Sequence, residues 1–506
     1  MTGPAGVDPA AAVLIGVGQA AHRDRTAATP AAALIRTAAQ RALDDTGAAA
    51  AVRARLRTVG VAHCLSWSAT DPAATLAATL GAPAGRTLST HPGGTAPLDL
   101  LHHTAAVIRA GDDQVTLLAG GEGIRALRAG LADDPETPDV PGAPQVLGTD
   151  RAPSHPAEER AGLYQPLNYY PLFENAIRAA GGWPGLRATD APGIVPVAEH
   201  TSWLGDLWAR FAQIAAANPY GCVDGDPPDA ERITTPGPAN RLIAHPYPKL
   251  LTANIAVDQA AAVLLCSAGT AAALGVPRDR WVFVAAGAGA TDHWHVGERA
   301  HLHRSPAIAS AGRAVLAAVG RGVDDLAHLD LYSCFPSAVQ VAAAELGVDL
   351  DRRTPTVTGG LTFAGGPASS YTFHALAELT GRLRAGAPDD AALATAVGWF
   401  LTKHAVTVLT AAPPRTPFRY ADVQGEVDAT PRRRLTDGHR GEATVESWTA
   451  TYDRDGEPSA AYASCLLPDG ARALAGSTHP DTVTAVAQAD PIGARVRLDG
   501  DGTFTI

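Results

Sequence analysis

The chain has 506 residues, which is too long for one simple domain, so two or three domains are expected. Hydrophobic residues make up 46% and charged residues 18%, a composition that excludes a disordered chain and is typical of a globular protein. The formal net charge of −11 argues against a nucleic-acid-binding protein, because the sequence supplies no broad basic surface.

The sequence also argues against secretion and membrane insertion. No Lys or Arg precedes the first apolar run, so no secretory signal is predicted. The most apolar window, residues 259–265, is too short to span a bilayer. The five cysteines are scattered and contain no CxxC pair, so neither a disulfide framework nor a zinc site is expected. A cytoplasmic protein fits these features best.

Strand-like and helix-like segments alternate in the first part of the chain. This alternation predicts a largely parallel sheet covered by helices. The strands are expected at residues 12–19, 58–63 and 114–121, and the helices at 30–45 and 73–80. Residues 88–101 pass through THPGGTAP into an apolar helix.

The same order of elements returns later in the chain and indicates a duplicated unit. Residues 12–19 correspond to 281–289, and residues 58–63 correspond to 329–335. Helices are expected at 307–319 and 337–346, and residues 391–410 are predicted to form a helix followed by a strand.

Two segments differ in character from these repeats. Residues 124–243 are rich in proline and aromatic residues, which is typical of a long excursion that folds over a sheet. After the proline-rich residues 411–417, short alternating segments predict a small all-β domain of OB-like type. The predicted domains are 1–123 with 244–275, a loop domain at 124–243, a second half at 276–412, and the β domain at 418–506.

The stretch 356–374, TVTGGLTFAGGPASSYTFH, contains two glycine pairs that bracket Leu361 and Phe363. Glycine pairs allow positive φ angles and close approach of the backbone. A loop of this kind that leads into a helix can cradle a ligand with its backbone N–H groups. The alternative is a loop that serves packing alone.

Several long motifs in this order resemble the thiolase superfamily, and most closely the thiolase-like protein type 1 group, which is related to sterol-carrier-protein-type thiolases. The motifs are YPLFENAIRAA (170–180), ANPYG (217–221), PYPKLLTANIAVDQAAAVLLCS (246–267), DLYSCFPSAVQ (330–340), TVTGGLTFAGGP (356–367) and LTKHA (401–405). The resemblance implies a duplicated five-layer α/β core, a loop domain over the active site and an added C-terminal β domain. It also implies acyl-CoA as partner, an activity like that of acetyl-CoA acetyltransferases in lipid metabolism, and no cofactor other than CoA or acyl-CoA as substrate or ligand.

Thiolases use a cysteine at a helix N-terminus to attack the thioester, a histidine in a Gly-His-Pro motif, and a second cysteine that moves the α-proton. This chain departs from that pattern at each of these positions. Gly93 and Gly94 stand in the nucleophile region, Gly366 replaces the motif histidine, and the C-terminal cysteine expected near residues 398–400 is absent. Chemistry through an acyl-cysteine is therefore not expected.

Other candidate site residues remain. The candidate catalytic residues are Cys334, His374, His404 and His91. The candidate substrate-binding residues are Gly93, Gly94, Thr95, Tyr332, Phe363, Gly365, Gly366 and Lys403. Each has a structural alternative: the cysteine as a small buried residue, the histidines as packing or capping groups, and the lysine as part of a solvated edge.

Three hypotheses about function stay open on the sequence. The first is an acyl-CoA-dependent acyltransferase that works without the usual cysteine. The second is a catalytically silent thiolase scaffold that binds CoA or an acyl chain, or that supports a partner enzyme. The third is a structural role in which the C-terminal domain docks a protein partner. A monomer and a dimer are both compatible with the sequence.

Overall fold

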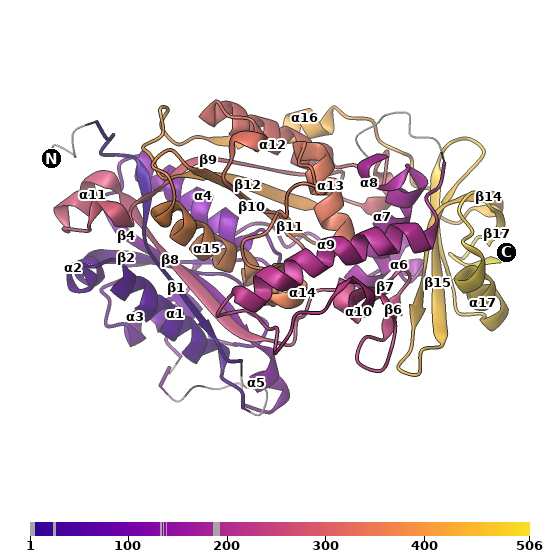
Figure 1. The fold of residues 1–506 in the computed structure, drawn as a ribbon, viewed down its shortest axis with the longest axis horizontal. Helices are drawn as coiled ribbons and strands as arrows, with labels where there is room; N and C mark the ends of the chain where they lie inside the picture. The colour runs from indigo at the N-terminus through magenta and orange to yellow at the C-terminus, as the bar shows by residue number, and fades with distance from the viewer. Residues whose placement is uncertain are drawn as a thin grey trace.

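The computed structural model describes residues 6–23, 27–131, 134, 136–137, 139–185 and 193–505. Its core is a large mixed sheet with helices on both faces, and a smaller antiparallel sheet forms the end of the molecule that carries the C-terminus (Figure 1). The predicted fold class, an α/β core followed by a C-terminal β domain, is confirmed.

The first half of the core sheet runs in the order β3-β2-β4-β8-β1. β2 is parallel to β3 and β4, whereas β8 is antiparallel to both β4 and β1. These strands are β1 (Ala12–Ala21), β2 (Leu56–Val61), β3 (Arg86–Thr90), β4 (Val115–Gly123) and β8 (Asp258–Ser267), and β5 (Gln145–Leu147) extends the edge at β3. Their helices are α1 (Ala31–Asp45), α2 (Ala49–Arg55), α3 (Pro72–Thr79), α4 (Ala96–Arg109) and α11 (Ala268–Ala273).

The second half, in the order β10-β11-β12-β9, repeats the pattern of β2-β4-β8-β1: one parallel pair is followed by two antiparallel pairs. The predicted correspondence of the two halves is confirmed, because β9 takes the place of β1 and β10 that of β2. The strands are β9 (Val282–Thr291), β10 (His328–Asp330), β11 (Ala391–Gly398) and β12 (Lys403–Thr410). The helices are α12 (Pro306–Val319), α13 (Pro336–Leu346), α14 (Gly360–Phe363) and α15 (Tyr371–Ala385). β1 pairs with β9 and thereby joins the two halves into one sheet.

The prediction for residues 391–410 is wrong in its first part. These residues form the hairpin β11–β12, not a helix followed by a strand. The alanines of β11 favour a helix when taken alone, but every residue of the strand is buried, and burial between two layers outweighs intrinsic propensity. The strand predicted at 329–335 is shorter than expected, because β10 ends at Asp330.

The segment between β4 and β8 supplies helices that lie over the core, and α9 crosses the face of the second half (Figure 1). The elements are α5 (Ile124–Arg128), α6 (Pro156–Arg160), α7 (Pro166–Ala179), α8 (Gly182–Gly185), α9 (Val197–Ala217), α10 (Ala230–Thr234), β6 (Leu242–Ala244) and β7 (Tyr247–Pro248). Short 3₁₀ helices occur at Lys249–Leu251, Arg278–Arg280, Val296–Glu298, Val323–Asp325 and Ala368–Ser370.

The C-terminal segment first adds β13 (Tyr420–Asp422) beside β9 and places α16 (Gln424–Asp428) against α12. The antiparallel sheet follows, built from β14 (Arg440–Tyr452), β15 (Pro458–Leu466), β16 (Arg472–Ser477), β17 (Arg495–Asp499) and β18 (Phe504–Thr505), with α17 (Pro480–Ala489) packed on it. The hairpin β6–β7 pairs with β14 through Ala244 and Thr451. None of the helices in the described ranges is long and apolar enough to cross a membrane.

Candidate active site

The loop between β3 and α4 lies where the thiolase resemblance places the nucleophile. Thr95 is the N-cap residue of α4 and Pro97 occupies its first turn, so Gly94 stands directly before the helix N-terminus. Gly93 has a φ of +144°, which favours glycine, and its backbone N–H donates to Ser369 Oγ at 3.1 Å.

Neighbouring atoms already fill the space that a side chain would need in this loop. A Cβ atom added to Gly94 would lie 2.2 Å from the Val397 carbonyl oxygen and 2.4 Å from the Tyr332 hydroxyl. A Cβ atom added to Gly93 would lie 2.7 Å from Lys403 Nζ. The loop thus has no cysteine at the position of the thiolase nucleophile, and neighbouring atoms leave no room for a cysteine side chain there.

Lys403 begins β12 and reaches under this loop. Its ammonium group donates to the Pro92 carbonyl at 3.1 Å and lies 5.7 Å from the centroid of the Trp399 ring. Burial lowers the pKa of Lys403, and the charge of Asp99 opposes that shift. Burial also raises the pKa of Asp99, whose Oδ2 accepts a 3.0 Å hydrogen bond from Thr95 Oγ1. The site therefore holds a buried amine and a half-buried carboxyl group in electrostatic contact.

Cys334 lies in the loop between β10 and α13. Burial raises the pKa of its thiol to about 12, although a hydrogen bond with Tyr170 acts in the opposite direction. The Tyr170 hydroxyl also donates to the Trp399 carbonyl at 2.9 Å, and its ring stacks on Phe335 with centroids 4.4 Å apart. Cys334 is consequently a neutral thiol at neutral pH and a poor nucleophile.

Tyr332 stands two residues before Cys334 and is also buried. Its ring meets that of Tyr371 edge to face at 5.5 Å, and burial raises the pKa of its hydroxyl. Tyr332 thus carries a protonated hydroxyl close to Gly94.

The two glycines in the loop after α14 differ in how much space surrounds them. A Cβ atom on Gly365 would lie 2.2 Å from Gln259 Oε1, whereas a Cβ atom on Gly366 would meet nothing closer than 3.5 Å. The position of the thiolase motif histidine therefore still has room for a β-carbon. Phe363 is buried, and its carbonyl accepts the backbone N–H of Cys222 at 2.8 Å.

The three candidate histidines lie in different surroundings. His374 on α15 contacts Gln19 Oε1 through Nδ1 at 2.7 Å, and burial lowers its pKa to about 4, so it is neutral. His404 Nε2 lies 3.1 Å from Asp292 Oδ2, beside the N-terminus of α12. Neighbouring residues on a strand point to opposite faces, and His404 accordingly faces away from Lys403. His91 is half-buried and donates its backbone N–H to Leu147.

The structure thus brings four loops together: 91–95, 332–335, 365–370 and 398–402. Of the sequence-predicted residues, these loops contain His91, Gly93, Gly94, Thr95, Tyr332, Cys334, Gly365 and Gly366, and Lys403 directly follows the last loop. Phe363, His374 and His404 lie on neighbouring helices and a strand outside the loops. Sequence reasoning missed Asp99, Tyr170, Ser369 and Trp399. Asp99 follows Thr95 by one helical turn, and Tyr170 opens the motif YPLFENA, so both had a signal in the sequence.

Backbone strain also concentrates in these loops. Among the described residues, four other than glycine have positive φ angles, and three of them lie here: Ala368 at 40°, Trp399 at 58° and Leu401 at 50°. Such conformations cost free energy and cluster at functional sites. Their position supports the assignment of the four loops as the candidate site.

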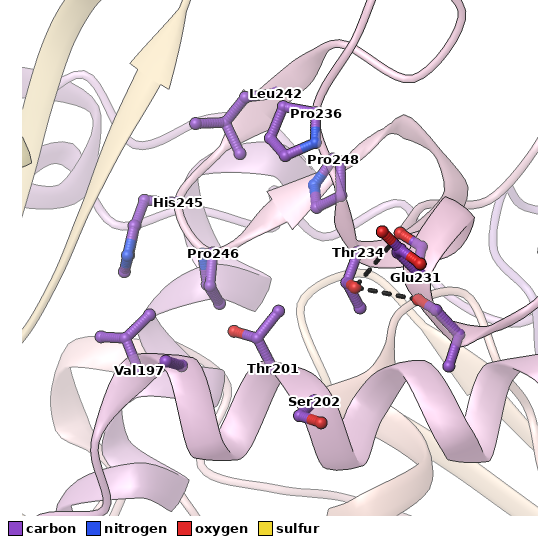
Figure 2. A pocket seen from close by; sticks show the side chains of 12 residues that line it. Val197, Thr201, Ser202, Glu231, Thr234, Pro236, Leu242, His245, Pro246 and Pro248 are labelled. Atoms are coloured by element: carbon purple, nitrogen blue, oxygen red, sulfur yellow. Dashed lines mark hydrogen bonds between the residues drawn. The ribbon is translucent and has the colours of Figure 1, made fainter.

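A separate hollow of about 700 Å³ opens between α9, α10 and the hairpin β6–β7 (Figure 2). Figure 2 shows Val197 and Thr201 on one side and three prolines, Pro236, Pro246 and Pro248, around the other. None of the candidate catalytic or binding residues lines it.

Comparison with known proteins places this geometry in context. Residues 422–503 match the family described as the thiolase-like protein type 1 additional C-terminal domain. No curated protein matches the sequence. The crystal structure of a monomeric SCP2-thiolase-like protein type 1 from Mycobacterium smegmatis shares 31% identity over 99% of both chains, with a TM-score of 0.82.

More distant structures share the fold alone. The Ltp2-ChsH2(DUF35) aldolase has 17% identity and a TM-score of 0.57, covering 79% of this chain and 98% of its own. The dimeric peroxisomal thiolase of Saccharomyces cerevisiae has 13% identity and a TM-score of 0.56, covering 80% of this chain and 98% of its own.

Proposed function

The chain belongs to the SCP2-thiolase-like proteins of type 1, and from that membership we propose that it binds CoA or acyl-CoA at the four loops and acts on it without an acyl-cysteine intermediate. The observation that carries the proposal is the closure of the nucleophile position: Lys403 and Tyr332 occupy the space beside Gly93 and Gly94. The enzyme we favour is an acyltransferase in which the acyl group passes directly from CoA to an acceptor.

Two features of the site support a catalytically active site over an inactive one. A buried amine and a half-buried carboxyl group whose ionised forms are disfavoured by desolvation are costly to keep in a folded protein unless they are used or paired. The strained residues Ala368, Trp399 and Leu401 add a further cost in the same place. The aldolase among the structural neighbours is named for a reaction other than thiolysis, which supports the use of this fold for other carbonyl chemistry.

The second candidate function is a catalytically silent scaffold that binds CoA or supports a partner through the C-terminal domain. The observation that favours it is the state of the remaining thiol, since the pKa of Cys334 is raised to about 12 and its usual partners are missing. The name of the aldolase neighbour includes a DUF35 component, which supports the idea of a partner protein.

The test is an isothermal titration with CoA, followed by intact-protein mass spectrometry after incubation with acetyl-, acetoacetyl- and longer acyl-CoAs. We expect saturable CoA binding and no acyl adduct on any of the five cysteines. A thioester adduct that Cys334→Ser removes would refute the absence of an acyl-cysteine, and no CoA binding would refute the ligand.

Turnover separates the two candidate functions. Free CoA released from bound acyl-CoA in the presence of small nucleophilic acceptors supports the transferase. Binding with no release across the panel supports the scaffold.

A further inference from the structure

Lysine is rare in this chain. Lys and Arg together number 40, and only two of these residues are lysines, Lys249 and Lys403. Lys249 is exposed, as expected of a cation that serves solubility, whereas Lys403 keeps only 8% of its surface exposed. Arginine supplies nearly every other positive charge, so charge alone does not account for a lysine at position 403. A lysine differs from an arginine in that its amine can lose its proton and act as a nucleophile.

The backbone on both sides is shaped around this side chain. A Cβ atom on Gly398 would lie 2.6 Å from Lys403 Cε, and one on Gly93 would lie 2.7 Å from Lys403 Nζ. Glycine at both positions is therefore what allows the lysine to lie where it does. The turn from Gly398 to Lys403 includes the strained residues Trp399 and Leu401. Its backbone is thus held in a costly conformation beside the amine.

The end of the side chain lies at the position of the missing nucleophile. Nζ lies 2.7 Å from the position that the Cβ atom of a cysteine at residue 93 would take, two residues before the N-cap residue of α4. Burial favours the neutral amine, while Asp99 and the Pro92 carbonyl hold the protonated form in place. A partly desolvated lysine of this kind reacts with carbonyl compounds.

We propose that Lys403 replaces the lost cysteine as the reacting group, and that it forms an imine with a ketone or aldehyde carbonyl of the ligand. This inference deepens the proposed function, since it rests on an acyl-CoA ligand and specifies one that carries a second carbonyl, such as a 3-ketoacyl-CoA. The neutral amine adds to the ketone carbon to give a carbinolamine, which loses one water as the C=N bond forms. Hydrolysis by one water restores the lysine and the ketone. Attack on the thioester itself would leave a stable amide, so the ketone is the productive target.

The experiment uses reductive trapping on the full chain. The protein is incubated with acetoacetyl-CoA, or with ethyl acetoacetate as a ketone without CoA, in the presence of sodium cyanoborohydride, and the label is located by peptide mass spectrometry. We expect a secondary amine on Lys403 and less label on Lys249, because Lys249 is exposed and lies outside the four loops. Lys249→Arg should keep the label and Lys403→Arg should lose it.

Each outcome decides the matter. The inference is overturned if the label is found only on Lys249 or the N-terminal amine, or if no label is found. This result is read from the peptide map of the wild-type protein, so it does not depend on whether Lys403→Arg folds. CoA binding without trapping refutes the role of Lys403 and leaves the proposed function standing. Trapping of ethyl acetoacetate on Lys403 without CoA binding supports the amine and refutes CoA as the ligand.

Discussion

The two vacated thiolase positions should respond in opposite ways when a methyl group is restored. In Gly94→Ala the new Cβ would lie 2.2 Å from the Val397 carbonyl oxygen, more than 1 Å inside ordinary contact, and 2.4 Å from the Tyr332 hydroxyl. The carbonyl belongs to β11 and cannot rotate away. Overpacking of this kind costs about 1–3 kcal/mol, and we expect the upper end because one obstacle is backbone.

Gly366→Ala is the matched control. Its Cβ atom would meet nothing closer than 3.5 Å and its φ is not positive, so the folded state accepts the methyl group without strain. The main effect is then a lower conformational entropy of the unfolded chain. We expect a change in the free energy of unfolding within about 1 kcal/mol, in the stabilising direction.

Urea unfolding followed by tryptophan fluorescence compares the two variants with the wild type. Tyr332→Phe in the Gly94→Ala background removes the clash with the hydroxyl but leaves those with the Val397 carbonyl and with the ring carbon Cζ at 2.7 Å, so it should restore only part of the loss. Equal stability of Gly94→Ala and Gly366→Ala would refute the closed nucleophile position on which the proposed function rests.

Three further predictions concern buried polar groups. Arg472 donates to both carboxylate oxygens of Glu446 at 2.8 Å and to the Gly297 carbonyl at 3.2 Å. Arg472→Met should therefore lower the free energy of unfolding by about 3 kcal/mol, because it leaves the Glu446 carboxylate without its partner. Proteolysis at the C-terminal sheet should become faster, and an unchanged rate would contradict this. The pKa of His374 is 6.5 in the unfolded chain and about 4 in the folded protein, so above pH 6.5 the contribution of this residue to stability does not change with pH. As the pH falls towards 4 the unfolded state gains the proton first, and stability should drop by up to about 3 kcal/mol. Urea midpoints between pH 7 and 5 should therefore fall less steeply in His374→Gln, and parallel slopes would count against a neutral buried histidine. Alkylation of Cys334 by iodoacetamide at pH 8 should be roughly a thousandfold slower than in the unfolded chain, and a comparable rate would show an accessible thiolate.

The architecture was predictable because its signals are local. Glycine-broken apolar runs mark β1 and β9, and the order of elements repeats closely enough to indicate the duplication. The failure at β11 is instructive, since AALATAVG has no polar alternation to distinguish a doubly buried strand from a helix. Only its place in the sheet, between β10 and β12, decides the matter.

The sequence predicted which thiolase residues are missing from the site better than it predicted which new contacts the site contains. Missing cysteines and a missing histidine are visible in a motif, whereas the contact of Lys403 with Pro92 joins residues 311 positions apart. Tyr170 likewise reaches Trp399 from a helix that the sequence assigns to another part of the fold. Periodicity carries no information about such meetings, which depend on how the two halves and the overlying helices are packed.

The pairing of β6 with β14 sets an order of events during synthesis. His245 binds the Ala450 carbonyl and stacks on Trp448, and its own carbonyl accepts from Thr449, 204 residues further along the chain. At translation rates of about 5–20 residues per second, the β6–β7 hairpin leaves the ribosome roughly 10 to 40 seconds before its partner strand exists. The core therefore waits with one open flank until β14 has been made, and a chain whose synthesis stops in this interval keeps that flank uncovered.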